Sequence, residues 1–527
     1  MKDLIYNNKS SLSARLILTG LLFFVGLPAN FTSAQYIGSS LPTEAQAPFL
    51  RGLAAVKQQQ WELAVTYFSE AQRAAPESPE VLFYLGAASD KAGGRDLLAI
   101  AWFRAYLAAA PNAANAEQVR AKILELEVKT ESAIQTLIRN ASETVAQLGE
   151  ETYKSYAYSN IAEAQATAGD TAGARRSLDK AKDAASRIQD SEVRDIAYNR
   201  IATAKARTGD MAGAWEMAER LRDEIWKTQV YSWIAQGLAG KGLISKAKET
   251  VAAKITRDRS KSTTYAYIAV DQAQTGDIVG AKETALSVTY DNDKVQAYSE
   301  IAVVQVQVGD VTGARESIAL AKEAASRLSD GQDNDWYYWH LVTAQAGAGD
   351  IAGAKETASR IKGDSYKPDA YCNIAKAQAK AGDAAGARQY ITMAKKVAER
   401  ITEDGGEARV YKDIATAQAS AGDIAGAMET AYWIKAGDVW RLRAYKEIAL
   451  AQVKSGPEIR SWIDLALTYQ EKSSLTDFHD FIDSLKDELP GMAVENLTEA
   501  TKDTANALKE LQDNDVKWQE LRAKSAP

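Results

Sequence analysis

The stretch Ala168–Ala174, which reads Ala-Gly-Asp-Thr-Ala-Gly-Ala, recurs along the sequence and indicates a repeat protein. The next copy is Thr208–Ala214. The first glycines of the other copies are Gly276, Gly309, Gly349, Gly382 and Gly422, with weaker copies at Gly242 and Gly456. Tandem units of about 35 residues are typical of a solenoid, in which each repeat packs on its neighbours.

Each unit predicts two helices joined by this stretch. In the first copy Tyr158, Ile161 and Ala162 are three and four residues apart, which places them on one helical face. The first glycine suits the left-handed end of a helix, and the aspartate that follows suits the N-cap of the next helix. The tyrosine is present in all nine copies, as Tyr158, Tyr198, Tyr231, Tyr265, Tyr298, Tyr338, Tyr371, Tyr411 and Tyr445. No period-two strand pattern recurs, so we expect an all-α fold.

The longer units carry extra residues in the second helix. These additions are Lys180–Arg187, Ala321–Arg327 and Ala394–Arg400. Seven added residues make close to two helical turns, so the apolar face drifts by only about 20°. The second helix of a long unit is therefore expected to keep its packing side.

Two segments before the tandem array resemble the tetratricopeptide-repeat (TPR) family. Residues 48–76 carry Gly52, Trp61, Ala64, Tyr67-Phe68, Ala71 and Pro76, and residues 79–111 carry Tyr84-Leu85-Gly86, Gly93-Gly94, Ala101, Phe103 and Pro111. The nine later copies are TPR-like: they have alanine for the small glycine, glutamine (Lys205 in one copy) for a frequent tyrosine, and no closing proline. Pentatricopeptide-like or other helical-hairpin repeats stay open for them.

This resemblance covers residues 48–470. It implies a right-handed superhelical α-solenoid of tandem helix-turn-helix repeats, with a concave groove that binds peptide segments. It does not specify the ligand.

The ends of the sequence predict export and capping. Residues 1–34 resemble a signal peptide, with a basic start, the apolar run Leu16–Val25 and small residues before Gln35. An uncleaved anchor is the alternative. After cleavage we expect a periplasmic or secreted protein with no later membrane span. Residues 35–47 are expected to be a flexible terminus, 48–112 two TPRs, 113–155 two connecting helices that could be a degenerate repeat, 156–470 nine TPR-like repeats, and 471–527 capping helices.

Composition and motifs argue against several functions. The net charge of -7 disfavours general nucleic-acid binding. Cys372 is the only cysteine, so no disulfide forms within the protein, and its place beside the repeat tyrosine is typical of a small packing residue. There are two histidines, His340 and His479, and none of the usual metal, phosphate-loop or nucleophile motifs. We therefore expect no enzymatic activity and no cofactor.

Two repeated residues have both a structural and a functional interpretation. The aspartates of the copies could bind metal, but N-capping accounts for every copy: Asp170, Asp210, Asp277, Asp310, Asp350, Asp383 and Asp423. The tyrosines could form a stacking surface for a sugar or peptide, but their common face with isoleucine and alanine favours core packing. The structural interpretation is preferred for both.

Departures from the repeat are the better candidates for function. Trp336 and Trp339 lie near the face of the first helix that lines the groove in TPR-like arrays, where they would anchor a partner or fill a packing gap. Basic residues also gather on the first helices of the last three units, where they would bind acidic groups or form a solvated face. The candidate basic contacts are Lys376, Arg409, Lys412, Arg443 and Lys446, together with Lys380 and Lys454.

The sequence thus favours an exported scaffold or adaptor that binds a protein or peptide, with or without acidic groups. Two alternatives remain at this stage. One is a helical-toroid enzyme that acts on glycans, and the other is a self-associating structural protein of the cell envelope. The partner, pathway and oligomeric state are not specified.

Overall fold

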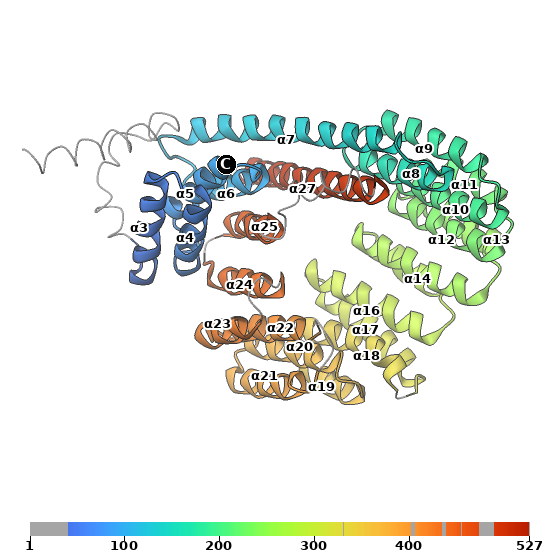
Figure 1. Cartoon of the computed structure of the whole chain (residues 1–527). Helices are drawn as coiled ribbons and strands as arrows, with labels where there is room; N and C mark the ends of the chain where they lie inside the picture. Colours follow the sequence, from blue (N-terminus) through green and yellow to red (C-terminus); the bar gives the residue numbers. More distant parts are fainter. Residues whose placement is uncertain are drawn as a thin grey trace, which may run out of the picture. The chain divides into compact units, whose positions relative to one another are not determined.

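The computed structural model describes residues 41–329, 331–401, 406–434, 439–454, 456–473 and 490–525. Within these ranges every regular element is a helix, which confirms the predicted all-α fold (Figure 1). The signal peptide predicted for residues 1–34 lies outside them. The described residues form two compact units: those of unit 1 lie within 41–137, 445–473 and 500–525, and those of unit 2 lie within 138–444 and 490–499.

Unit 1 contains both TPR-like pairs predicted before the tandem array. Its helices are α3 (Thr43–Lys57), α4 (Trp61–Ala74), α5 (Pro79–Ala92), α6 (Asp96–Ala109), the first part of α7 (Ala116–Val145), the end of α24 (Val439–Gln452), α25 (Pro457–Ser473) and the latter part of α27 (Pro490–Ser525). Helices α3 and α4 pack as one pair, and α5 and α6 pack as the next.

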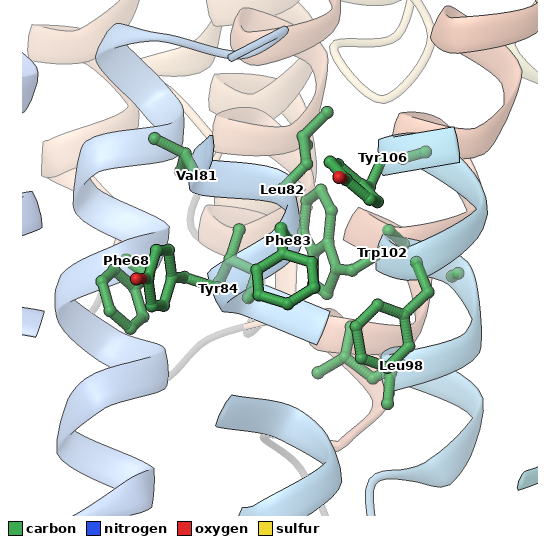
Figure 2. Packing of buried hydrophobic residues seen from close by; sticks show 14 of the residues in the cluster. Phe68, Val81, Leu82, Phe83, Tyr84, Leu98, Trp102 and Tyr106 are labelled. Carbon is green, nitrogen blue, oxygen red and sulfur yellow. The ribbon is translucent and has the colours of Figure 1, made fainter. Parts of the chain in front are cut away.

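Large rings fill the core of these two pairs. The ring centroids of Phe68 and Tyr84 are 5.4 Å apart, and those of Phe83 and Tyr106 are 5.2 Å apart (Figure 2). Gly52 faces the ring of Phe68 so closely that an added Cβ would lie 2.4 Å from it. The small residue of the repeat therefore makes room for an aromatic ring of the second helix.

Helix α7 differs from the expected pair of connecting helices. It is one helix of 30 residues. The segment contains neither glycine nor proline, so nothing in its backbone chemistry ends the helix midway. Its first part contributes Val119, Ile123 and Leu126 to the core of unit 1.

The C-terminal helices complete the core of unit 1. Helix α25 packs against α6, and its Trp462 and Tyr469 are buried in the same cluster as the TPR rings. Gln470 donates from its Nε2 to Ser69 Oγ of α4 at 2.7 Å, across 401 residues of sequence. Helix α25, which lies almost wholly within the segment predicted to form the nine TPR-like repeats (156–470), thus covers the TPR-like pairs near the start of the sequence instead.

Unit 2 is a solenoid of helix pairs. Each first helix packs against its own second helix and against the first helix of the next pair (Figure 1). The pairs are α8 (Glu151–Thr167) with α9 (Thr171–Ser186), α10 (Ser191–Arg207) with α11 (Met211–Arg220), α12 (Glu224–Gly240) with α13 (Ile244–Lys254), α14 (Asp258–Gln274) with α15 (Ile278–Ala285), α16 (Asp291–Gln307) with α17 (Val311–Ser326), α18 (Gln332–Gly347) with α19 (Ile351–Arg360), α20 (Lys367–Lys380) with α21 (Ala384–Ala398), and α22 (Gly406–Ser420) with α23 (Ile424–Trp433). The second helices α9, α17 and α21 are the long ones predicted from the spacing.

The recurring stretch forms the turn between the two helices of a pair. In the copy that follows α16, Gly309 has a φ of 83°, a conformation that favours glycine. Asp310 then accepts a hydrogen bond from Gly313 N at 2.8 Å, which confirms the predicted N-cap. A Cβ on Gly313 would lie 2.1 Å from Asp310 Oδ2, so the second glycine makes room for the cap.

A buried glutamine extends this cap into a polar bridge. Gln305 donates from its Nε2 to Asp310 Oδ2 at 2.8 Å, and its Oε1 accepts from the hydroxyl of Ser317 at 2.7 Å. The same three-residue bridge joins Gln272, Asp277 and Thr284, joins Gln345, Asp350 and Thr357, and joins Gln418, Asp423 and Thr430. This bridge accounts for the glutamine found where TPRs often have tyrosine.

Small side chains fill the rest of the interior of unit 2. Alanine supplies more than half of the buried residues in each of its three largest clusters. The repeat tyrosines pack against these clusters: Tyr231, Tyr298 and Tyr338 are buried, and Tyr158, Tyr198, Tyr265, Tyr371 and Tyr411 are half-buried. The prediction that the tyrosines serve core packing is confirmed.

Candidate functional site

The predicted tryptophan pair forms an aromatic cluster on first helices of unit 2. Trp336 and Trp339 lie on α18 and are both half-buried. The ring of His340 lies 4.2 Å from that of Trp336 and 4.7 Å from that of Trp339, each in an edge-to-face arrangement. Tyr366 comes just before α20, and the centroid of its ring lies 6.1 Å from that of Trp339. We call Trp336, Trp339, His340 and Tyr366 the aromatic cluster.

Helix stacking brings an acid to this cluster. His340 and Glu300 each come two residues after the repeat tyrosine of their own first helix, so packing of α16 against α18 places them side by side. His340 Nδ1 lies 2.9 Å from Glu300 Oε1, and the two side chains are 13% and 29% exposed. The carboxylate therefore fixes the orientation of the imidazole.

Two ring nitrogens of the cluster have no hydrogen-bond partner among the described residues. They are Trp339 Nε1 and His340 Nε2, and both atoms are buried. Buried polar atoms are nearly always paired in folded proteins. Ser299 Oγ on α16 and Gln378 Oε1 on α20 also have no partner among the described residues, so the two ring nitrogens are distinguished by their place in the aromatic cluster.

Polar side chains on either side of the cluster are paired with one another. Asn292 Nδ2 donates to the Tyr337 hydroxyl at 2.9 Å. Asn373 Nδ2 donates to Thr343 Oγ1 at 3.0 Å, and the Thr343 hydroxyl in turn donates to the backbone oxygen of Trp339 at 2.9 Å. The cluster is thus tied into α16 and α20 through ordered contacts.

The predicted basic contacts are largely engaged within the protein. Arg409 forms an ion pair with Asp369, and Lys412 forms one with Asp413. Burial is the main cause of the raised pKa of Asp369, about 6, and the nearby Asp413 adds to it, whereas Arg409 acts in the opposite direction. The charges of Arg409 and Lys412 are therefore offset by acids on the same helix layer.

The remaining basic candidates lie in different surroundings. Arg443 stacks on Trp440 at 4.5 Å, and Lys376 is half-buried on α20. Lys446 belongs to unit 1, where its Nζ lies 2.7 Å from Asp464 and 2.8 Å from the Thr468 hydroxyl. Their role as partner contacts stays a prediction.

Other candidates from the sequence prove to be structural. Cys372 is 1% exposed, and burial raises the pKa of its thiol, so it is protonated and inert. The hydrogen bond from Gly313 N lowers the pKa of Asp310, as expected of a capping carboxylate. Within the described ranges, no group of three or more His, Cys, Asp or Glu side chains is arranged to hold a metal ion. Among the helices described, none combines the length and apolar character needed to cross a bilayer.

Sequence reasoning missed His340, Glu300 and Tyr366 as members of the site. A signal for the first two was present, because both occupy the same repeat position: His340 in the tryptophan-rich helix and Glu300 in the first helix of the unit before it. Tyr366 gave no such signal, since it lies in a loop whose path depends on the packing of α19 and α20.

These features define the class of protein: an all-α solenoid of tandem, TPR-like helix-turn-helix repeats with an irregular aromatic cluster on one unit. No protein-family model and no curated protein sequence matches it.

Two solved structures are similar at low scores. One is the "Crystal structure of APC/C hetero-tetramer Cut9-Hcn1", with a TM-score of 0.26, 13% identity, and coverage of 85% of this chain and 98% of that one. The other is the "Structure of Naa15/Naa10 bound to HypK-THB", with a TM-score of 0.29, 13% identity, and coverage of 92% and 77%. The class assignment therefore rests on the repeat geometry described above.

Proposed function

We propose that this protein is a non-enzymatic scaffold that binds a segment of another protein on the first-helix face of unit 2, with the aromatic cluster as its anchor. The observation that carries the proposal is the concentration of half-buried tryptophan and of buried ring nitrogens without a described partner at one unit of a regular array. Tryptophan in such partly desolvated positions is enriched among residues that dominate protein interfaces.

The regularity of the other units supports the same proposal. Capping, glutamine bridges and alanine packing account for the residues that recur, so they need no ligand to explain them. Trp336, Trp339 and His340 depart from the repeat without serving the cap or the bridge. Departures of this kind are where a repeat scaffold carries binding specificity.

The packing of the acids also supports a binding role over hydrolysis. A glycan hydrolase needs two neighbouring acids, one of which has a raised carboxyl pKa. Asp369, whose pKa is raised, and the nearby Asp413 are such a pair. They are bonded to Arg409 and Lys412, and Asp369 is 7% exposed. Such an arrangement suits structural ion pairs.

We further propose that the protein acts outside the cytoplasm. The basic start, apolar run and small residues of 1–34 support export, with cleavage before Gln35. Amino-terminal sequencing of the protein from its native cells would test this. A mature protein that still begins at Met1 would contradict cleavage and leave the uncleaved anchor.

Capture of a partner tests the binding role. The mature protein is immobilised, envelope extract of its own cells is passed over it, and a captured protein is identified and then purified for affinity measurement. We expect Trp336→Ala to weaken this affinity by at least about tenfold, the typical effect of truncating an interface anchor. Trp433→Ala is the matched control, because Trp433 lies on α23, also in unit 2, and is 69% exposed.

Equal affinity of the Trp336→Ala and unaltered proteins, with unchanged thermal midpoints, would remove the aromatic cluster from the binding surface. Sedimentation of the mature protein over a hundredfold concentration range tests the alternative of a self-associating structural protein. A mass that rises with concentration would favour self-association as the main role.

A further inference from the structure

The two ring nitrogens of the aromatic cluster that lack a described partner differ in chemistry. Trp339 Nε1 carries a hydrogen and can only donate. His340 Nδ1 faces Glu300 Oε1 at 2.9 Å, and a carboxylate only accepts, so Nδ1 carries a proton. In the neutral imidazole, His340 Nε2 is then left with a lone pair and accepts. One donor and one acceptor therefore sit on consecutive residues of α18, both buried and both without a protein partner among the described residues.

The two rings that carry these nitrogens are neighbours on α18. The ring centroids of Trp339 and His340 are 4.7 Å apart. The ring of Trp336 lies 4.2 Å from that of His340 and is itself half-buried. Pairing of the two nitrogens would remove an unfavourable feature of the free protein.

The backbone of a peptide matches this pair of groups. Every non-proline residue carries one N–H donor and one carbonyl acceptor, and they are held in rigid, planar amide units. An extended segment also projects side chains alternately to its two sides, so one of them can pack on an uncovered tryptophan face while the backbone is bound.

Resting on the proposed function, we propose that the aromatic cluster recognises the backbone of an extended segment of the partner. Trp339 Nε1 donates to a backbone carbonyl oxygen of the segment, and His340 Nε2 accepts from a backbone N–H. Trp336 turns aside and packs on a neighbouring apolar side chain. Glu300 keeps the imidazole in the accepting tautomer and acts as a positioning residue.

An anionic ligand is the competing chemistry at the same atoms. If the imidazole were protonated, both nitrogens would donate, and a carboxylate would satisfy them better than an amide. The experiment therefore compares an amide, an ester and a carboxylate of otherwise similar shape.

The full-length protein, labelled with nitrogen-15 in its indole groups, is titrated with N-acetyl-leucine N-methylamide and followed by nuclear magnetic resonance. The Trp339 signal is assigned by its loss in Trp339→Phe, and the Trp233 indole, on α12 of the same unit, is the internal control. We expect the Trp339 indole N–H signal to move and saturate, while that of Trp233 stays in place.

The methyl ester of N-acetyl-N-methyl-leucine keeps two carbonyl groups and carries no N–H. We expect it to bind about tenfold more weakly, because His340 Nε2 is then left unpaired. Equal binding of the ester, tighter binding of N-acetyl-leucine carboxylate, or no movement of the Trp339 signal with the amide would each overturn the assignment.

One variant separates this inference from the proposed function. Trp339→Phe keeps an aromatic ring and removes the donor, and because Nε1 has no partner among the described residues, the thermal midpoint should stay the same or rise. We expect about tenfold weaker affinity for the captured partner. If Trp336→Ala loses the partner while Trp339→Phe keeps it, the binding site stands and backbone recognition is wrong. If both keep it, the site itself is wrong.

Discussion

Units 1 and 2 are built from helix pairs of similar length but with different interiors. In unit 1 the pairs α3–α4 and α5–α6 meet through large rings such as Phe68, Tyr84 and Trp102 (Figure 2). In the largest clusters of unit 2 more than half of the buried residues are alanine, and a glutamine bridge joins the two helices of several pairs. The same architecture thus rests on apolar volume in one region and on close approach plus fixed hydrogen bonds in the other.

The two units also differ in which helices pack against their helix pairs. The pairs of unit 2 cover one another in sequence order, because consecutive first helices pack together. The ring-rich pairs of unit 1 also pack against α25, which begins only at Pro457, whereas α6 ends at Ala109. Packing between neighbours in the sequence therefore joins the helix pairs α8 to α23 of unit 2, whereas the TPR-like pairs of unit 1 also depend on a helix from a distant part of the sequence.

The largest expected effect concerns that distant contact. Trp462→Ala should lower the stability of unit 1 by about 5 kcal/mol, because a side chain that is 2% exposed leaves a large cavity. Hydrogen exchange read on peptides of α6 measures the loss. Trp433→Ala, at a site 69% exposed, should change stability by less than about 0.5 kcal/mol. Unaltered protection of α6 in Trp462→Ala would show that the C-terminal helices do not hold unit 1 together.

The repeat tyrosine of unit 2 should come next. Tyr298 is 5% exposed and packs in the alanine-rich core, so Tyr298→Ala should lower stability by about 3 to 4 kcal/mol. Thermal and denaturant unfolding, followed by hydrogen exchange on α16, measure this. Affinity for the captured partner should be unchanged. Lost binding with an unchanged thermal midpoint would place the tyrosines on the ligand surface instead.

The buried acid of unit 2 should give a pH dependence. Aspartate in an unfolded protein ionises near pH 4, whereas the pKa of Asp369 in the folded protein is about 6. Between these values the folded state keeps a proton that the unfolded state has released, so the free energy of unfolding falls as pH rises from about 4 to about 6. The fall is at most about 3 kcal/mol.

Asp369→Asn should remove this pH dependence, as measured by denaturant unfolding at half-unit pH steps. Asp179→Asn, which changes an exposed acid of α9, is the control and should keep it. A profile for Asp369→Asn that matches the unaltered protein would mean that the acid is not buried as described.

The smallest effect tests the polar bridge. Asp350 accepts from Gly353 N at 3.0 Å and from Gln345 Nε2 at 3.2 Å, so Asp350→Ala should lower stability by about 1 kcal/mol, the usual effect of losing a cap. Added calcium or zinc should change neither the loss nor the starting stability. A metal-dependent difference would mean that the aspartates bind a metal ion.

Most of the repeat could be predicted from sequence, because its determinants are local. The Gly-Asp turn, the cap and the apolar spacing act within one unit, and each is visible in a window of about 15 residues. The long second helices were predicted for the same reason. Two helices were expected in the place of α7, because Ala133–Gln147 faintly resembles the long second helix of later repeats. The observed helix is continuous because no glycine or proline interrupts its 30 residues.

Only part of the candidate site could be predicted from the sequence. Trp336 and Trp339 stand out as departures from the repeat, but the bond between His340 and Glu300 forms only when α16 and α18 pack together. The sequence predicted that Arg409 and Lys446 offer positive charge to a partner. In the structure they form ion pairs with Asp369 and Asp464, which lie on other helices, so these pairs could not be predicted from one helix alone.

The sequence by itself determined the all-α class, the unit length, the N-caps and the packing role of the tyrosines, because short-range backbone and side-chain chemistry specifies each of them. Tertiary structure alone decided that α25 and α27 join the first TPR-like pairs, that a histidine–carboxylate pair stands beside the tryptophans, and that Trp339 and His340 keep buried nitrogens without a partner among the described residues. These features depend on which helix faces meet in space, and a pattern read along one helix does not contain that information.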